Sequence, residues 1–462
     1  MEFVVGILLL LTFFGLAYYC IKGHNLMIGF LIITILWTVL SFLGAAFASP
    51  EFLSTTAFYS NGEPVKAIAI LNKIYQSAPE GWGTTLVNVC WGAWFGRVLM
   101  ETGIASTLIR KTVELGGDKP MVTIALLNIV TAIIFTAMTG AGPVIAIGVI
   151  VLPIMMSLGV PKAIAMFSFM ESVAAGIYLN PVNFAQYRAF FIEVDEMPNF
   201  TLGWYAGKWG YAALIISVVV TTILAGFFLK KSKTSHAWAA QTRGASEQKD
   251  APLYTLILPI VPVVLKIWLD FSVIGGFVIA GFAALFLCGK MNKSFKENCQ
   301  LVNKLYYDGV VDTAPLVGFL LTLPMFNTCA SYASPYFKEV LGGIMPTNEY
   351  VVCALFAALS ILGFFRGPLT LYGCGAATLG VLSAVGHFSV PFLFCVFTIP
   401  ATTVNVGSCI TQSWIAWGLA YTKVESRDYL KLSIPFAYIC SILLYILTAF
   451  TVTGLGPEWF LS

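Results

Sequence analysis

Two long apolar stretches, each interrupted twice by residues that end helices, are the feature that most constrains how this chain can fold. The stretches cover residues 136–191 and 361–417. Their interruptions contain Gly, Pro or Asn and lie at 139–143, 180–183, 366–368 and 400–405. Paired, interrupted apolar segments in two halves of a chain are typical of the substrate site of a secondary transporter.

The composition predicts a membrane protein. Of the 462 residues, 58% are hydrophobic and only 10% are charged, whereas about 25% of the residues of a soluble domain are charged. The net charge of +3 is too small to indicate a nucleic-acid partner, so we expect none. The ten cysteines are scattered without a CxxC pair, and no spacing of ligating residues predicts a metal site.

Ten segments are apolar and long enough to predict membrane spans, since a spanning helix needs about 20 apolar residues. They are 3–21, 26–48, 81–109, 163–192, 204–229, 253–269, 271–289, 308–330, 391–421 and 431–455. Most of the 25 basic residues fall in loops on one side of this arrangement, which is the cytoplasmic side by the positive-inside rule. We therefore predict an integral protein of the bacterial inner (plasma) membrane with both termini extracytoplasmic and with the bilayer as its surroundings.

Two further apolar segments, 121–158 and 349–386, each turn at a Gly-Pro corner. Their arms are at or below the short end of the spanning range of about 17–25 residues. Each segment could be two short spans or one re-entrant hairpin, and the charge distribution does not separate these alternatives. We favour hairpins, because the corners lack the charged residues of a surface loop.

Similar residues recur at nearly constant separation in the two halves, as in Gly142-Pro143 against Gly367-Pro368 and Asn183 against Asn405. The charge distribution gives the two copies opposite orientations, so we predict inverted repeats. The predicted fold is an all-α polytopic membrane protein with about ten transmembrane helices and two re-entrant hairpins, divided as follows. Scaffold helices and an outer loop occupy 1–80, the first repeat 81–229, a cytoplasmic linker 230–252, scaffold helices and an inner loop 253–307, and the second repeat 308–462. The repeats contain the hairpins 121–158 and 349–386 and the broken helices 163–192 and 391–421.

The predicted substrate site lies where the breaks and the hairpin corners meet. Pro181 and Pro400 remove backbone donors inside long apolar segments, so each segment should unwind there. The freed helix ends would offer N–H groups to an anion. The candidate substrate-binding residues are Thr139, Gly140, Gly142, Asn180, Asn183, Arg366, Gly367, Thr370, Thr402, Thr403, Asn405, Ser408 and Gln412. The alternative is that these residues only satisfy the broken backbone.

Two charged residues within the apolar segments deserve separate hypotheses. Arg366 at the second corner is expensive to bury and can form a bidentate pair with a carboxylate. It could instead snorkel or pair structurally with Glu171. Glu171 is the acidic residue deepest in an apolar run, which suits a proton carrier; the alternative is a structural partner for an arginine. Arg97 and Glu101 are four residues apart and predict an ion pair on one helix surface.

At these residues the chain resembles the gluconate permease family, within the ion transporter superfamily that includes divalent-anion and dicarboxylate carriers. The segment 92–103 is similar to the family helix G-x-x-x-G-K-x-x-x-x-[ST]-G, and 367–370 followed by 375–380 is similar to its second-hairpin signature. The resemblance implies symport of an organic anion by an elevator-type movement, as a homodimer. The Ser-Asn-Thr corners of sodium-coupled dicarboxylate carriers are absent here, which favours protons over sodium.

The sequence thus predicts a secondary transporter of a small carboxylate, such as a sugar acid or a dicarboxylate, rather than an enzyme. No cofactor is expected beyond a coupling ion, H⁺ or Na⁺. A cation/proton antiporter of the same architecture would need acidic residues at the site. A membrane-embedded enzyme would need a catalytic constellation at one membrane face, and the sequence displays none.

Overall fold

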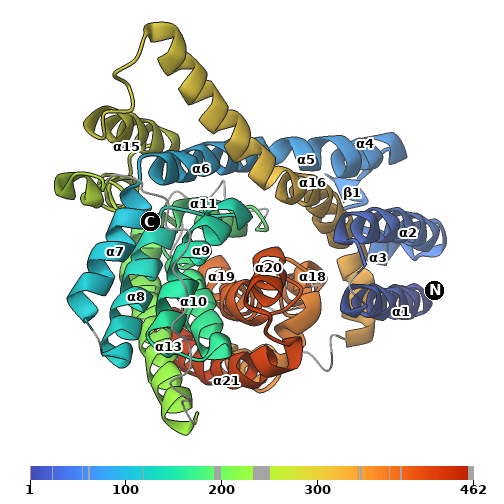
Figure 1. Cartoon of the computed structure of the whole chain (residues 1–462). Coiled ribbons are helices and arrows are strands. Elements are labelled where there is room, and N and C mark those ends of the chain that lie inside the picture. The colour runs from blue at the N-terminus through green and yellow to red at the C-terminus, as the bar shows by residue number, and fades with distance from the viewer. Residues whose placement is uncertain are drawn as a thin grey trace.

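The computed structural model describes residues 2–22, 24–54, 56–60, 63–117, 119–191, 199–232, 250–341, 343, 346–373, 375–385 and 388–455. Within these ranges the chain is almost entirely helical, as predicted (Figure 1). The strands found there are β1 (Tyr59–Ser60) and β2 (Glu63–Pro64), which pair antiparallel in the loop expected after the second helix. Most of the predicted linker, residues 233–249, lies outside the described residues.

The N-terminal part of the chain begins with α1 (Glu2–Ile21) and α2 (Leu26–Phe47) on one side of the molecule and reaches the other side at α7 (Ile104–Gly116) (Figure 1). The helices between α2 and α7 are α3 (Pro50–Ser54), α4 (Ala67–Asn72), the π-helical η1 (Lys73–Ser77), α5 (Ala78–Gly81) and α6 (Gly83–Glu101). The segment 81–109 was predicted as one span, but the helix is interrupted between α6 and α7. Gly103 there adopts a φ of 76°, a conformation that glycine reaches without steric cost.

The first interrupted stretch forms four helices: α8 (Pro120–Phe135), α9 (Ala141–Ser157), α10 (Lys162–Ile177) and α11 (Pro181–Arg188). The helices α8 and α9 are the two arms of the predicted first hairpin. The helices α10 and α11 are bent by 67° where they meet. The break falls at Asn180-Pro181, as the sequence predicted.

The middle of the chain contains α12 (Leu202–Tyr205), the π-helical η3 (Ala206–Gly210), α13 (Tyr211–Lys231), the 3₁₀-helical η4 (Leu253–Ile257), α14 (Val261–Leu269), α15 (Val273–Leu287) and α16 (Phe295–Leu341). A span was expected at 308–330, but α16 has 47 residues and is therefore about 70 Å long at 1.5 Å per residue. It starts early because Ser294 and Glu297 exchange backbone hydrogen bonds in a capping box.

The second interrupted stretch contains α17 (Glu349–Ala358), the 3₁₀-helical η5 (Ser360–Arg366), α18 (Gly375–Val385), α19 (Val390–Ile399), the π-helical η6 (Pro400–Ser408) and α20 (Ser413–Thr422). The chain then forms α21 (Ser426–Thr451). The helices α17 and η5 are bent by 64°. The expected break after Pro400 is a π-helical segment followed by non-helical residues before α20.

The interrupted helices lie in the middle of the fold. The long helix α16 forms a flank on one side of them, α13 packs against α10, and α21 packs against α10 and η6 (Figure 1). The helix α16 itself packs against α6, α2 and α1. The helix α10 packs against α8, α13 and η6. Segments from both halves of the chain therefore meet around α10 and η6.

Several helices have the length and composition to cross a membrane. Four qualify by themselves among the described residues: Met27–Phe47, Leu202–Lys231, Val390–Thr422 and Ser426–Thr451. The number reaches six if each bent pair counts as one span. The apolar helices Glu2–Leu16, Pro120–Phe135, Ala141–Ser157 and Val273–Leu287 are shorter. The total of ten spans, the inverted repeats and the domain limits remain predictions.

Candidate functional site

The first break is closed by the side chain of Asn180. Its Oδ1 atom accepts hydrogen bonds from the backbone N–H groups of Val182 (2.9 Å) and Asn183 (3.2 Å), so it caps α11. Its Nδ2 atom donates to the carbonyl oxygens of Phe135 and Met138, each at 3.1 Å. Asn180 therefore joins the break to the end of α8 and uses its whole side chain for structure.

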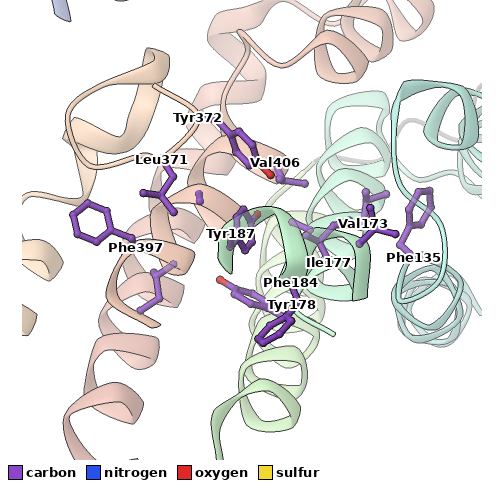
Figure 2. Packing of buried hydrophobic residues seen from close by; sticks show 14 of the residues in the cluster. Phe135, Val173, Ile177, Tyr178, Phe184, Tyr187, Leu371, Tyr372, Phe397 and Val406 are labelled. Atoms are coloured by element: carbon purple, nitrogen blue, oxygen red, sulfur yellow. The ribbon is translucent and has the colours of Figure 1, made fainter. Parts of the chain in front are cut away.

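The second break is held against the first by two tyrosines. The Tyr187 hydroxyl of α11 lies 2.9 Å from Thr402 Oγ1, and the Tyr178 hydroxyl lies 2.5 Å from Thr403 Oγ1. Figure 2 shows Tyr178 and Tyr187 in the middle of the buried cluster, between the two halves. Every residue from 390 to 408 is buried. The two interrupted helices thus meet inside the protein, as the sequence analysis required.

The corner of the second hairpin also reaches this meeting point. Arg366 donates hydrogen bonds to the carbonyl oxygen of Tyr372 and to Gln412 Oε1, both at 3.2 Å. The Tyr372 hydroxyl donates to Gln186 Oε1 of α11 at 2.6 Å. The corner is sharply turned, since Phe365 and Arg366 have φ values of 54° and 60°. Such left-handed residues cost about 1–3 kcal/mol each and cluster at ligand-binding sites.

Several buried polar atoms around these contacts have no hydrogen-bond partner. An unsatisfied buried polar group costs about 1–3 kcal/mol, so these atoms favour a hydrogen-bonding partner from outside the protein, such as water or a ligand. Both amide atoms of Asn405 in η6 are unpaired, and its side chain is fully buried. The other unpaired atoms are Glu171 Oε2, Asn183 Oδ1, Gln186 Nε2 and Thr370 Oγ1.

Glu171 lies beside η6 with a single hydrogen bond. Its Oε1 atom accepts from the Ser408 hydroxyl at 2.7 Å, and its side chain is fully buried. Its Oε2 atom lies against Gly407, where a Cβ atom would be only 2.1 Å away. The expected alternative of a Glu171–Arg366 pair is wrong, because the hydrogen bonds of Arg366 go to Tyr372 and Gln412 and no basic side chain of the described residues pairs with Glu171.

The corner of the first hairpin faces α6 and α16 instead. Gly140 caps α9 with a φ of 98°, and a Cβ on Gly142 would lie 2.1 Å from Asp312 Oδ2. Arg97 forms a bidentate pair with Asp312, with N–O distances of 2.7 and 2.6 Å. The expected pair of Arg97 with Glu101 is therefore wrong. Glu101 instead accepts from Lys290 at 3.3 Å.

The predicted site residues divide into two groups. Those linked at the second break, the second corner and α11 are Asn183, Arg366, Gly367, Thr370, Thr402, Thr403, Asn405, Ser408 and Gln412, with Glu171 beside Ser408. Those at the first corner and the first break are Thr139, Gly140, Gly142 and Asn180. The site also includes four residues that were not predicted: Tyr178, Gln186, Tyr187 and Tyr372. Each carries a polar group within or next to an interrupted apolar segment, and this feature of the sequence could have identified them.

A cavity with a volume of about 540 Å³ lies on the other side of α11. Its lining includes Pro181, Phe184, Ala185 and Arg188 of α11, together with residues of η1, α5, α6, α14 and α16. Three basic side chains, Lys73, Arg188 and Lys266, line it, and none of the lining residues in the described part of the chain is acidic.

The chain was compared with known proteins by sequence and by structure. No family model and no curated protein matches the sequence. The fold is similar to that of the YdaH transporter of Alcanivorax borkumensis, whose crystal structure has been described as revealing an unusual topology. The TM-score is 0.59 at 12% sequence identity, over 94% of this chain and 100% of that chain. The chain therefore has the fold of a polytopic membrane transporter.

Proposed function

We propose that the protein is a secondary active transporter that moves a small organic anion, such as a sugar acid or a dicarboxylate, across the inner (plasma) membrane. Transport is symport with protons or sodium by an elevator-type movement, and the functional unit is a homodimer, as the resemblance to the gluconate permeases implies. The observation that carries the proposal is the cluster of unpaired buried polar atoms where two interrupted helices meet the second hairpin.

The charge at this cluster favours an anion. Arg366 projects from a strained corner and donates hydrogen bonds to two neutral oxygen atoms, Tyr372 O and Gln412 Oε1. A guanidinium group can exchange such contacts for a bidentate pair with a carboxylate. The unpaired amide of Asn405 and hydroxyl of Thr370 supply donors and acceptors for the remaining oxygens of a hydroxy acid.

The arrangement of the helices suits transport. An anion at the cluster would touch segments of both halves, so its binding could favour one arrangement of the halves over another. The similar fold belongs to a protein described as a transporter. Non-helical backbone is tolerated at membrane depth only where protein buries it or where it lines a cavity, and transporters use such breaks to bind solutes.

A cation/proton antiporter is the second candidate. The observation that favours it is Glu171, a buried carboxyl group with one oxygen atom unpaired. An antiporter site would hold the cation at this carboxyl group and would have no use for a guanidinium at the same meeting point. Arg366 therefore favours the anion transporter.

Uptake into proteoliposomes tests the proposal. Purified protein is reconstituted, and accumulation of labelled gluconate, succinate and citrate is measured under imposed proton or sodium gradients. We expect accumulation of at least one carboxylate, and its loss in Arg366→Ala with the protein still folded. Arg366→Lys is the matched control, because it keeps the charge but loses the bidentate geometry; it should retain a fraction of the uptake. Full uptake by Arg366→Ala would remove Arg366 from the site.

A further inference from the structure

The cavity beside α11 is separated from the site at the interrupted helices by α11 itself. Pro181, Phe184, Ala185 and Arg188 line the cavity, and their spacing of three, four and seven residues places them on one face of the helix. Asn183 and Gln186, which carry unpaired atoms of the other site, lie on the opposite face of α11 and do not line the cavity. The cavity is thus a second compartment and not an extension of the unpaired cluster.

The cationic side chains of the cavity come from three different walls. Lys73 belongs to η1, Lys266 to α14 and Arg188 to α11. Lys266 also forms an exposed ion pair with Asp270 at 2.6 Å, but Asp270 is not among the residues that line the cavity. The charged residues among the described lining are all basic, and a concave site lined by charge of a single sign concentrates the field and attracts counter-ions.

A further polar group in the cavity lacks a partner. Asn327 of α16 contributes to its lining, and neither the oxygen nor the nitrogen of its amide has a hydrogen bond. Asn327 also lines an adjoining cavity of about 290 Å³ between α16, α18 and α19. An amide can donate to one ligand oxygen while the lysines neutralise the charge.

We propose that this cavity is a second anion-binding site, which takes a small polycarboxylate. A compound with two or three carboxylate groups can meet cations on several walls at once, whereas a monocarboxylate meets fewer of them. The volume of 540 Å³ lies within the range of about 300–1,000 Å³ that small-molecule sites occupy. The proposal holds whether or not the bound anion is transported.

Thermal unfolding of the full-length protein in detergent tests this site with citrate as the probe. Citrate is titrated at constant ionic strength, because exposed charges are screened by salt, and a ligand that binds the folded protein raises the unfolding temperature. We expect citrate to stabilise the wild type. In the double variant Lys73→Gln/Lys266→Gln, the citrate concentration that gives the same rise in unfolding temperature should increase at least about tenfold. Each partly exposed cation contributes about threefold to fivefold to the affinity for citrate. Acetate should require higher concentrations than citrate.

Two further variants decide where citrate binds. Lys208→Gln removes an exposed lysine of η3 outside the cavity and should leave the titration unchanged. Arg366→Ala alters the interrupted-helix site and should also retain citrate stabilisation. The proposal is overturned if citrate fails to stabilise the wild type, if the double variant titrates like the wild type, or if Lys208→Gln loses the effect equally. Loss of the effect in Arg366→Ala alone would assign citrate to the interrupted helices.

Discussion

The two breaks differ in how far the protein satisfies its own polar groups. At the first break Asn180 uses both its amide oxygen and its amide nitrogen in four hydrogen bonds. At the second break Asn405 is equally buried but uses neither. The same residue type therefore serves structure in one half and is left available in the other. Two asparagines that both lie at a break thus have different roles.

Asp312 at the first corner and Glu171 at the second break also differ in how far the protein satisfies them. Asp312 lies against Gly142 at the first corner and is neutralised by Arg97, and the two side chains are 16% and 28% exposed. Glu171 lies against Gly407 at the second break and accepts one hydrogen bond from Ser408. The first corner is internally paired, whereas no basic side chain of the described residues pairs with Glu171 beside the second break. We infer that the second break, together with Glu171 of α10, contains the groups that respond to a ligand or a proton.

Replacing the two asparagines gives the largest expected effect. Asn180→Ala removes a helix cap and leaves two carbonyl groups and two N–H groups without partners, so it should lower the free energy of unfolding by about 2–4 kcal/mol. Asn405→Ala removes no hydrogen bond within the protein and should change the free energy of unfolding by less than about 1 kcal/mol while abolishing uptake. Denaturant unfolding in mixed micelles measures both. Equal losses of stability would remove the distinction between the breaks.

The Arg97–Asp312 pair should give the next largest effect. Arg97→Gln and Asp312→Asn each leave a partly buried charge unpaired and should each cost about 1–3 kcal/mol. The double variant should lose little more than either single variant, because the pair acts as one unit. Lys111→Gln, which breaks the exposed pair with Glu114, is the matched control and should unfold like the wild type. Additive losses would show that Arg97 and Asp312 act independently.

The positions of the breaks could be predicted because their causes are local. Proline removes a backbone donor and disfavours helix at the residue before it, so Asn180-Pro181 was a visible break in the sequence. The Gly-rich corner before α9 was visible for a similar reason. The interruption at Gly103 could not be predicted from an apolar run, because the surrounding residues are apolar enough to hide a single turn.

The partners across the fold could not be predicted from local patterns. Arg97 and Glu101 have the spacing of a helical ion pair, yet Asp312 competes successfully for Arg97 because packing of α16 on α6 brings it close. The contact between Tyr187 and Thr402 likewise joins segments far apart in the chain. The sequence therefore predicted which residue types gather at the site, but not which of them are already satisfied by one another.

Glu171→Gln should have the smallest effect on stability and a clear effect on coupling. A carboxyl group that is fully buried with one hydrogen bond is least costly to bury when it carries a proton, and glutamine has nearly the same shape as that neutral form. We therefore expect the free energy of unfolding to change by less than about 1 kcal/mol. Uptake driven by a proton gradient should be lost, while exchange of labelled for unlabelled substrate continues, because exchange needs no net proton movement.

The same liposomes separate this role from a structural one. The initial rate of uptake is measured with and without an inward proton gradient, and exchange is measured with equal substrate on both sides. Ser408→Ala, which removes the one hydrogen bond of Glu171, is the companion variant and should alter the pH dependence of uptake without abolishing it. If Glu171→Gln keeps the normal response to the proton gradient, Glu171 does not carry the coupling proton. If exchange is lost together with gradient-driven uptake, Glu171 has a structural role and supports the binding site.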